Sequence, residues 1–146
     1  MAERVHLLDV NVLCALMHEG HIHHRRVTRW FDGTERLQWA LCPVTEAGFV
    51  RVSTNSRNQT MNVTFEDAAE MLDSLEKHPG YHFWPIAESW NRLTAPFAGS
   101  IFGYKQVTDA VLLGLTIQRK GVVVTMDSGF RQLAGKKYAG SVLILE

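Results

Sequence analysis

Four carboxylates stand at positions where an α/β chain can gather them at one edge of its sheet. Asp9 and Asp127 each end an apolar run, so both are expected to follow buried strands. Glu46 lies in the first turn of the helix after a predicted strand, and Asp109 lies in the first turn of a helix that leads into one. Because open α/β sheets bind ligands beyond the carboxyl ends of their strands, these positions predict one acidic site.

The chemistry suited to such a site is metal-assisted hydrolysis. Carboxylates that are close together in apolar surroundings cannot all ionise unless a cation neutralises them. A ligand set made of oxygen atoms, with no Cys or His partner, favours Mg²⁺ or Mn²⁺ over zinc. These cations position a scissile phosphate, lower the pKa of an attacking water and stabilise the leaving oxygen. The acids therefore predict phosphodiester hydrolysis.

Each acid also has a purely structural explanation. Asp9 stands where a turn former or a helix N-cap is common. Asp109 and Glu46 would complement the dipoles of their helices, and Asp127 would cap a short helix over 128–133. These explanations stay open for any single acid. The functional interpretation depends on all four acids occurring together at strand and helix edges.

Two polar residues near the acids are candidate substrate-binding residues. Asn11 follows Asp9 by two residues, where it would orient Asp9 or a metal-bound water, or instead act as the N-cap of the first helix. Arg51 lies beyond Glu46 on the same predicted helix. There it would meet an RNA backbone or form a surface salt bridge.

Alternating strands and helices are expected to position these residues. The predicted strands cover 5–8, 38–42, 81–84, 122–127 and 141–145, and the predicted helices cover 11–19, 21–31, 45–52, 64–78, 88–93, 108–121 and 128–133. Thr64 and Thr108 are predicted N-caps, and 55–62 is a predicted polar loop. Strands separated by helices predict a three-layer α/β/α architecture with a central parallel sheet. A length of 146 residues with 46% apolar composition suits one domain over 1–146.

The composition excludes several classes of protein. The formal net charge is zero, so any phosphate binding must use local basic groups such as Arg25, Arg26 and Arg29. No apolar run is long enough for a signal peptide or a membrane span, so we expect a cytoplasmic protein. Cys14 and Cys42 lack metal-type or secretory spacing and are predicted to be buried thiols without a disulfide.

Two further groups of residues invite a functional explanation. One is a crowded histidine tract, which lacks defined metal partners and more simply forms the polar start of the second helix: His18, His21, His23 and His24. The other would stack on unpaired RNA bases and steer the backbone, or would serve local packing: Phe97, Phe102, Tyr104 and Lys105.

Four segments resemble the signature blocks of PIN-domain ribonucleases, specifically the VapC toxins of bacterial toxin–antitoxin pairs. They are residues 7–13, 42–51, 106–113 and 124–130, and they occur in the family's order and spacing over nearly the whole chain. The resemblance implies a parallel sheet in the order 3-2-1-4-5, Mg²⁺- or Mn²⁺-dependent RNA cleavage, a homodimer and inhibition by a cognate VapB-like antitoxin. It also implies an acidic quartet that is intact here: Asp9, Glu46, Asp109 and Asp127.

Three functions from different classes remain at this point. The first is a metal-dependent endoribonuclease toxin. The second is a phosphatase of the HAD type in which Asp9 would attack phosphate, and it is disfavoured because Asn11 occupies the place of the second acid. The third is a catalytically silent binding module on a PIN-like fold, because a fold alone does not guarantee activity.

Overall fold

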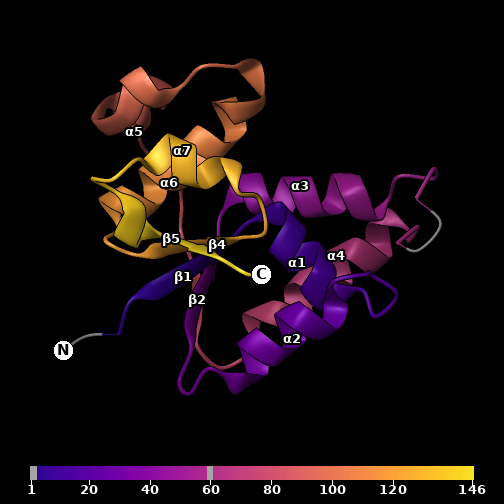
Figure 1. Cartoon of the computed structure of the whole chain (residues 1–146). Coiled ribbons are helices and arrows are strands. Elements are labelled where there is room, and N and C mark those ends of the chain that lie inside the picture. The colour runs from indigo at the N-terminus through magenta and orange to yellow at the C-terminus, as the bar shows by residue number, and fades with distance from the viewer. Residues whose placement is uncertain (1–2, 59–60) are drawn as a thin grey trace.

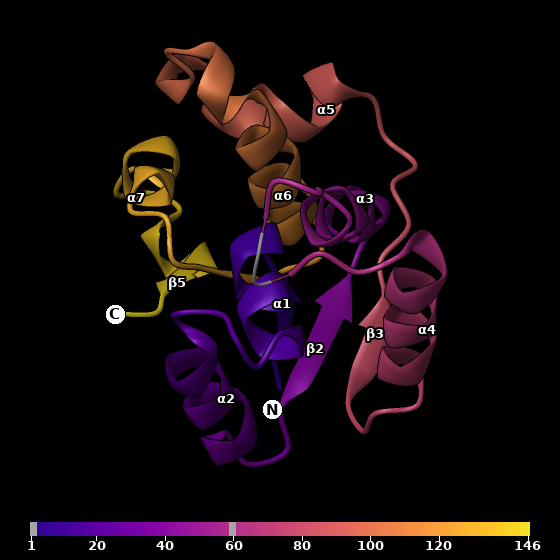
Figure 2. The ribbon, with the colours of Figure 1, turned by 90° about the vertical axis from the view of Figure 1, so that its right-hand side faces the viewer.

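The computed structural model describes residues 3–58 and 61–146. The predicted polar loop over 55–62 includes residues 59 and 60, which lie outside the described residues. A central sheet lies between two groups of helices, as Figures 1 and 2 show from two directions. This arrangement confirms the predicted three-layer α/β/α class.

The sheet contains five parallel strands in the order β3-β2-β1-β4-β5. Their bounds are β1 Val5–Leu8, β2 Gln38–Leu41, β3 Tyr81–Phe83, β4 Val122–Thr125 and β5 Val142–Ile144. Leu7 of the central strand pairs with Ala40 on one side and Val123 on the other. The strand order that the resemblance implies is therefore confirmed, and the carboxyl ends of all five strands lie at one edge.

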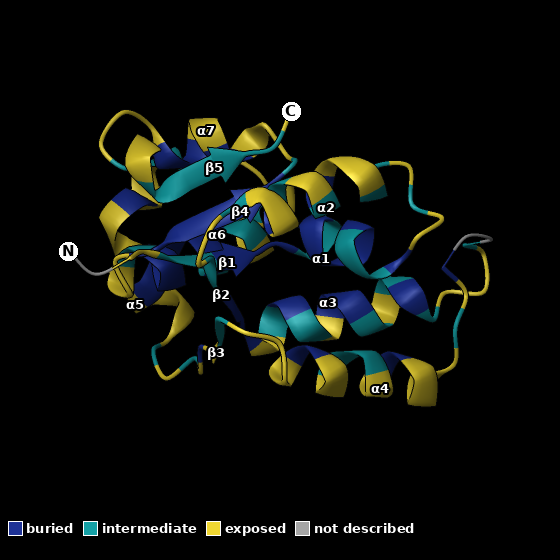
Figure 3. Ribbon diagram, turned by 90° about the horizontal axis from the view of Figure 1, so that it is seen from below, coloured by how far each residue is buried: buried dark blue, intermediate teal, exposed yellow. Residues whose placement is uncertain are grey.

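Seven α-helices and three short 3₁₀ helices connect the strands within the described residues. The α-helices are α1 Val10–Met17, α2 His24–Gly33, α3 Pro43–Ser53, α4 Phe65–Glu76, α5 Trp90–Thr94, α6 Val107–Gln118 and α7 Gly129–Ala134. The 3₁₀ helices are η1 Ala95–Ser100, η2 Tyr104–Gln106 and η3 Ala139–Ser141. Exposed residues gather on the outward faces of the helices, whereas β1 and β4 are largely buried (Figure 3).

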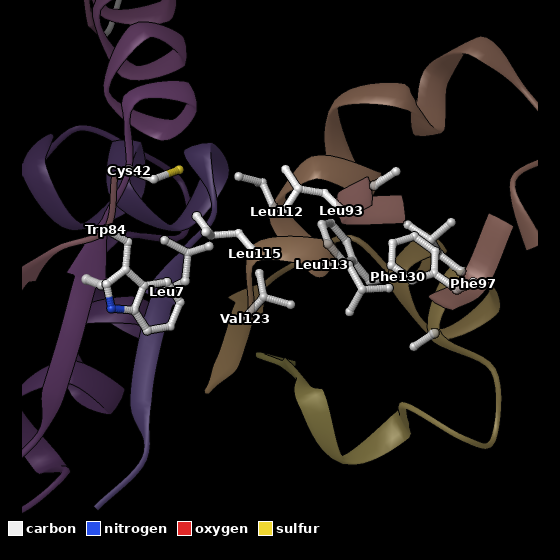
Figure 4. Close-up of a cluster of buried hydrophobic side chains, with 14 residues drawn as sticks. Leu7, Cys42, Trp84, Leu93, Phe97, Leu112, Leu113, Leu115, Val123 and Phe130 are labelled. Atoms are coloured by element: carbon white, nitrogen blue, oxygen red, sulfur yellow. The ribbon is translucent and has the colours of Figure 1, made fainter. Parts of the chain in front are cut away.

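Successive residues of the central strands pack on opposite faces of the sheet. Leu7 and Val123 belong to a hydrophobic cluster that α5, α6 and α7 complete (Figure 4), and Leu8 and Val124 belong to a second cluster completed by α1 to α4. This alternation follows from the two-residue period of a strand. Because both faces are covered, the central strands are continuous apolar runs, which makes their polar ends stand out in the sequence.

Several helix starts differ from the sequence-based boundaries, and α2 begins at His24 instead of residue 21. α1 begins at Val10 with Asp9 as its N-cap, so the interpretation of Asn11 as N-cap is wrong. α3 begins at Pro43, because proline lacks the N–H that the first helical residue leaves unused. α6 continues directly from η2 at Val107, so Thr108 is not its N-cap. By contrast, Thr64 is confirmed as the N-cap of α4.

The structure shows the environment of the two cysteines and the length of every described helix. Cys14 and Cys42 are buried and free, as predicted, and burial raises the pKa of the Cys14 thiol to about 12. Such a thiol stays protonated and unreactive near neutral pH. No helix of the described residues is long and apolar enough to cross a membrane.

Candidate active site

Asp9 is a buried carboxylate at the carboxyl end of the central strand β1. Its side chain is only 7% exposed. Oδ1 accepts a hydrogen bond from the Val10 N–H at 2.7 Å, and Oδ2 accepts one from Thr125 Oγ1 at 2.7 Å. Burial raises the pKa of Asp9 and the charge of Asp127 adds to that rise, while the two hydrogen bonds oppose it. Asp9 thus caps α1 and also presents a charge that is costly to bury at the sheet edge.

Thr125 organises the polar groups around Asp9. It is fully buried at the end of β4, and its hydroxyl donates to Asp9 Oδ2. The same oxygen accepts hydrogen bonds from the Asp127 N–H at 3.0 Å and from Asn11 Nδ2 at 3.4 Å. One donor and two acceptor positions are all that a hydroxyl offers, so Thr125 is saturated. The sequence analysis did not identify this residue, because a threonine that ends a run of valines is ordinary in a strand.

Asn11 joins α1 to the segment after β4. Its Oδ1 accepts a hydrogen bond from the Met126 N–H at 3.3 Å, and its Nδ2 donates to Thr125. Asn11 therefore fixes Thr125 and the chain before Asp127 relative to the helix that Asp9 caps. These two hydrogen bonds are compatible with the predicted role of Asn11 in orienting Asp9. The alternative role of Asn11 as the N-cap of α1 is excluded, because Asp9 occupies that position.

Asp109 and Asp127 are electrostatically coupled to Asp9. Asp109 is half-buried in the first turn of α6. Burial, together with the charges of Asp9 and Asp127, raises the pKa of Asp109 to about 7. Asp127 is exposed, and its Oδ1 accepts a hydrogen bond from the Gly129 N–H at 2.8 Å, which fixes the start of α7. The structure thus brings three of the four predicted acids into one electrostatic group.

Glu46 stands apart from this group. It is half-buried in the first turn of α3, and its pKa is raised by burial and by the charge of Glu76 at the end of α4. The same two glutamates add to the effect of burial in raising the pKa of the Tyr81 phenol. Within residues 3–58 and 61–146, no set of three or more His, Cys, Asp or Glu side chains is arranged to hold a metal ion. The aspartates and Glu46 therefore occupy neighbouring helix and strand ends without forming a closed ligand shell.

Comparison with known proteins identifies the family. A family model described as the PIN domain matches residues 6–136. The chain belongs to the PIN-domain family. Within it, the chain is similar to ribonuclease VapC38 of Mycobacterium tuberculosis, with 44% identity over 131 residues that cover 90% of this chain and 91% of the relative. The resemblance to VapC ribonucleases is confirmed, and a phosphatase of the HAD type is excluded.

Two solved structures share the PIN-like fold. FitAcB from Neisseria gonorrhoeae has a TM-score of 0.62 and 18% sequence identity, covering 97% of this chain and 96% of that chain. VapBC2 from Rickettsia felis, bound to a DNA fragment from their promoter, has a TM-score of 0.59 and 11% identity, covering 88% and 92%. At these identities the likeness concerns the fold alone.

The basic side chains of this PIN-family chain are exposed. Arg51 lies in the last turn of α3 and forms no ion pair within the described part of the chain. The surface salt bridge that was its structural alternative is therefore not found there. Arg25, Arg26 and Arg29 are likewise exposed on α2.

The histidine tract serves local structure. His18 Nε2 and Ser53 Oγ share a hydrogen bond of 2.8 Å, which joins α1 to α3. His24 Nδ1 bonds to the Ala15 carbonyl at 2.7 Å, and His21 Nδ1 accepts the His23 N–H at 3.0 Å. These bonds explain the tract without a metal ion.

Proposed function

We propose that this chain is the ribonuclease toxin of a toxin–antitoxin pair and that residues 1–146 form one PIN domain. The observation that carries the proposal is the buried carboxylate of Asp9 beside Asp109 and Asp127, in a chain of the VapC family. We infer that the substrate is RNA and that the reaction is hydrolysis of phosphodiester bonds.

The proposed cofactor is Mg²⁺ or Mn²⁺. The fit rests on the donor set, because three coupled carboxylates, one of them buried, need a positive charge to ionise together. Asp9, Asp109 and Asp127 would hold the ion, and Glu46 is kept as the fourth acid because α3 begins at the same edge of the sheet. The ion would activate an attacking water and stabilise the leaving oxygen.

The remaining residues are proposed to prepare this site. Thr125 holds Asp9 in one orientation and favours its ionised form through the 2.7 Å hydrogen bond. Asn11 keeps the segment of Asp127 against α1. Arg51, exposed and without an ion pair among the described residues, is available to a phosphate of the RNA backbone.

The proposed partner is a VapB-like antitoxin, and we infer that the toxin acts as a homodimer in the cytoplasm. An Arg or Lys of the antitoxin would mimic the metal charge among the acids. The Rickettsia felis VapBC2 complex supports a protein partner for this family. Co-expression with the adjacent small open reading frame should yield a complex without nuclease activity, and a complex that cuts RNA at the full rate contradicts this partner.

The decisive experiment compares two Asp→Asn variants on a 5′-labelled RNA with Mg²⁺ or Mn²⁺. Asp9→Asn should abolish cleavage while keeping the fold, because it removes one ligand charge and preserves shape. Asp32→Asn, which changes an exposed acid of α2, is the matched control and should cleave like the wild type. EDTA should stop cleavage by the wild type and by the Asp32→Asn variant. Full activity of Asp9→Asn would refute the site.

A catalytically silent module is the second candidate. Two observations favour it: the described residues hold no closed metal-ligand set, and the charge that acts on Glu46 is that of Glu76. The same assay separates the two functions. A silent module would bind RNA or an antitoxin but would leave labelled RNA intact at every cation concentration.

A further inference from the structure

Two bulky aromatic side chains are exposed to solvent shortly before Asp109 in the chain. Phe102 is 78% exposed and Tyr104 is 83% exposed, and both belong to residues 101–105, which we call the aromatic loop. Phe97, only a few residues earlier, is 5% exposed and packs against Tyr138. Local packing therefore explains Phe97. It does not explain Phe102 and Tyr104, for which the sequence-based alternative of stacking on RNA bases remains.

Hydrogen bonds hold the aromatic loop in place without help from its rings. The Phe102 N–H donates to Gln106 Oε1 at 2.8 Å, and Gln132 Nε2 donates to the Ser100 carbonyl at 2.9 Å. The side-chain amides of Gln106 and Gln132 are also hydrogen-bonded to each other. A Cβ added at Gly103 would meet no atom within 4 Å, so no described residue covers the loop there.

The supports of this loop are the helices that carry two of the aspartates. Gln106 is the N-cap of α6, whose first turn contains Asp109, and Gln132 lies on α7, which follows Asp127. The segment between α5 and α6 lies at the top of the molecule in both Figure 1 and Figure 2. Hydrogen bonds therefore join the loop to the two helices next to Asp109 and Asp127.

The extended backbone between the two residues favours projection of their side chains from one side of the chain. Gly103 is extended, with φ −154° and ψ 160°, and residues two apart in an extended chain share a face. Two residues of extended chain span roughly 6.6 Å. That is about twice the 3.4 Å rise between stacked bases, so the spacing has room for one base between two rings. Lys105 follows, exposed and outside the described ion pairs.

We propose that Phe102 and Tyr104 stack on an unpaired base of the RNA substrate and that Lys105 binds an adjacent phosphate. This inference rests on the proposed function and adds to it the residues that select single-stranded RNA. Bases in a duplex are already paired and stacked, whereas unpaired bases can insert between aromatic side chains. A cation beside the rings also offsets the field of the acids, which repels RNA.

The test combines protein variants with RNAs that lack one base. The double variant Phe102→Ala/Tyr104→Ala is compared with Phe65→Ala, which removes a 71% exposed aromatic residue at the start of α4. The substrate is a 5′-labelled single-stranded RNA, used intact and with an abasic site at each position in turn. Loss of one stacked base weakens binding roughly 5- to 150-fold, so KM should rise by that factor for the double variant with little change in kcat.

The abasic series makes the result specific. At one position near the cut, removal of the base should raise KM of the wild type and leave KM of the double variant unchanged. Phe65→Ala should behave as the wild type, and Tyr104→Phe should retain the wild-type KM. An unchanged KM in the double variant, or equal losses at every abasic position, overturns the inference while cleavage by the wild type still supports the proposed function.

Two further readouts separate the remaining outcomes. Light scattering reports whether the double variant changes the mass of the particle. A switch from dimer to monomer with an unchanged KM would assign the loop to an interface between copies and overturn RNA binding. If the wild type cuts no RNA, the proposed function fails, and fluorescence anisotropy with the same labelled RNAs decides whether the rings bind a base.

Discussion

Replacing Asp109 by asparagine should stabilise the metal-free protein, although it removes a proposed ligand. In the folded state the pKa of Asp109 is about 7, whereas an unperturbed aspartate has a value of 3.8. The folded state therefore binds a proton more tightly than the unfolded state. Between these two pH values the stability contributed by Asp109 falls as pH rises, and above about pH 7 the full penalty remains. The neutral amide of the Asp109→Asn variant would carry no such penalty.

The size of this effect follows from the burial of the group. A rise from 3.8 to about 7 sets an upper limit of roughly 4 kcal/mol at about 1.4 kcal/mol for each pKa unit. Because Asp109 is half-exposed, solvent screening reduces this to about 1–2 kcal/mol. Loss of a negative charge at the start of α6 costs about 0.3–1 kcal/mol. The net gain is about 1 kcal/mol, or about 2–4 °C in Tm.

The assay is thermal unfolding in EDTA at pH 8 and pH 5. Asp109→Asn should melt above the wild type at pH 8, and the difference should shrink at pH 5, where the wild-type carboxyl is protonated. Glu70→Gln, in an exposed acid of α4, is the control and should change neither value. Added Mg²⁺ should then raise the Tm of the wild type more than that of the variant. A variant that melts at or below the wild type in EDTA at pH 8 would refute the coupling of the aspartates.

Two other substitutions test the framework of the site. Thr125→Val removes the hydroxyl that holds Asp9, so RNA cleavage measured by initial rates should fall about 10- to 100-fold and its acidic limb should move to higher pH, while Thr125→Ser should retain activity. Gly114→Ala places a methyl group against the Leu93 carbonyl, so the packing of α5 on α6 should loosen and the free energy of unfolding in urea should fall by about 1–3 kcal/mol. An unchanged pH profile in Thr125→Val would contradict the first prediction. An unchanged urea midpoint in Gly114→Ala would contradict the second.

The strand ends could be predicted because the chain is buried on both faces of its sheet. Runs such as residues 122–125 are apolar almost throughout, so the first carboxylate after them marks the sheet edge. Parallel connection then places Asp9 and Asp127 at the same edge without knowledge of any side-chain contact. Helix starts were harder to predict. The N-cap of α1 is Asp9 and not Asn11. The sequence could not separate these two candidates, because both residue types cap helices well and the two positions lie within one helical turn of each other.

Thr125 could not be recognised from spacing because its importance lies in hydrogen bonds across the sheet. It joins β4 to Asp9 at the end of β1 and to Asn11 on α1, which lie more than a hundred residues earlier in the chain. A threonine in a strand is ordinary in sequence, because its branched side chain suits a pleated surface. Only the pairing of β1 with β4 shows that this hydroxyl faces the carboxylate.

Glu46 marks the limit of inference from topology. The strand before it and Pro43 determine that it lies in the first turn of α3, but the direction of its side chain depends on how that helix is rotated. Each residue turns roughly 100° about a helix axis, so a small change in packing moves a carboxylate from one neighbour to another. Here the neighbouring charge is Glu76 on α4, and the repulsion raises the pKa of Glu46. The aspartates repel one another for the same physical reason, so a divalent cation bound at this edge would lower the cost of every ionised acid near it. The positions of the strand-end acids can therefore be inferred from the order of the chain, whereas the environment of Glu46 is set by the packing of α3 against α4.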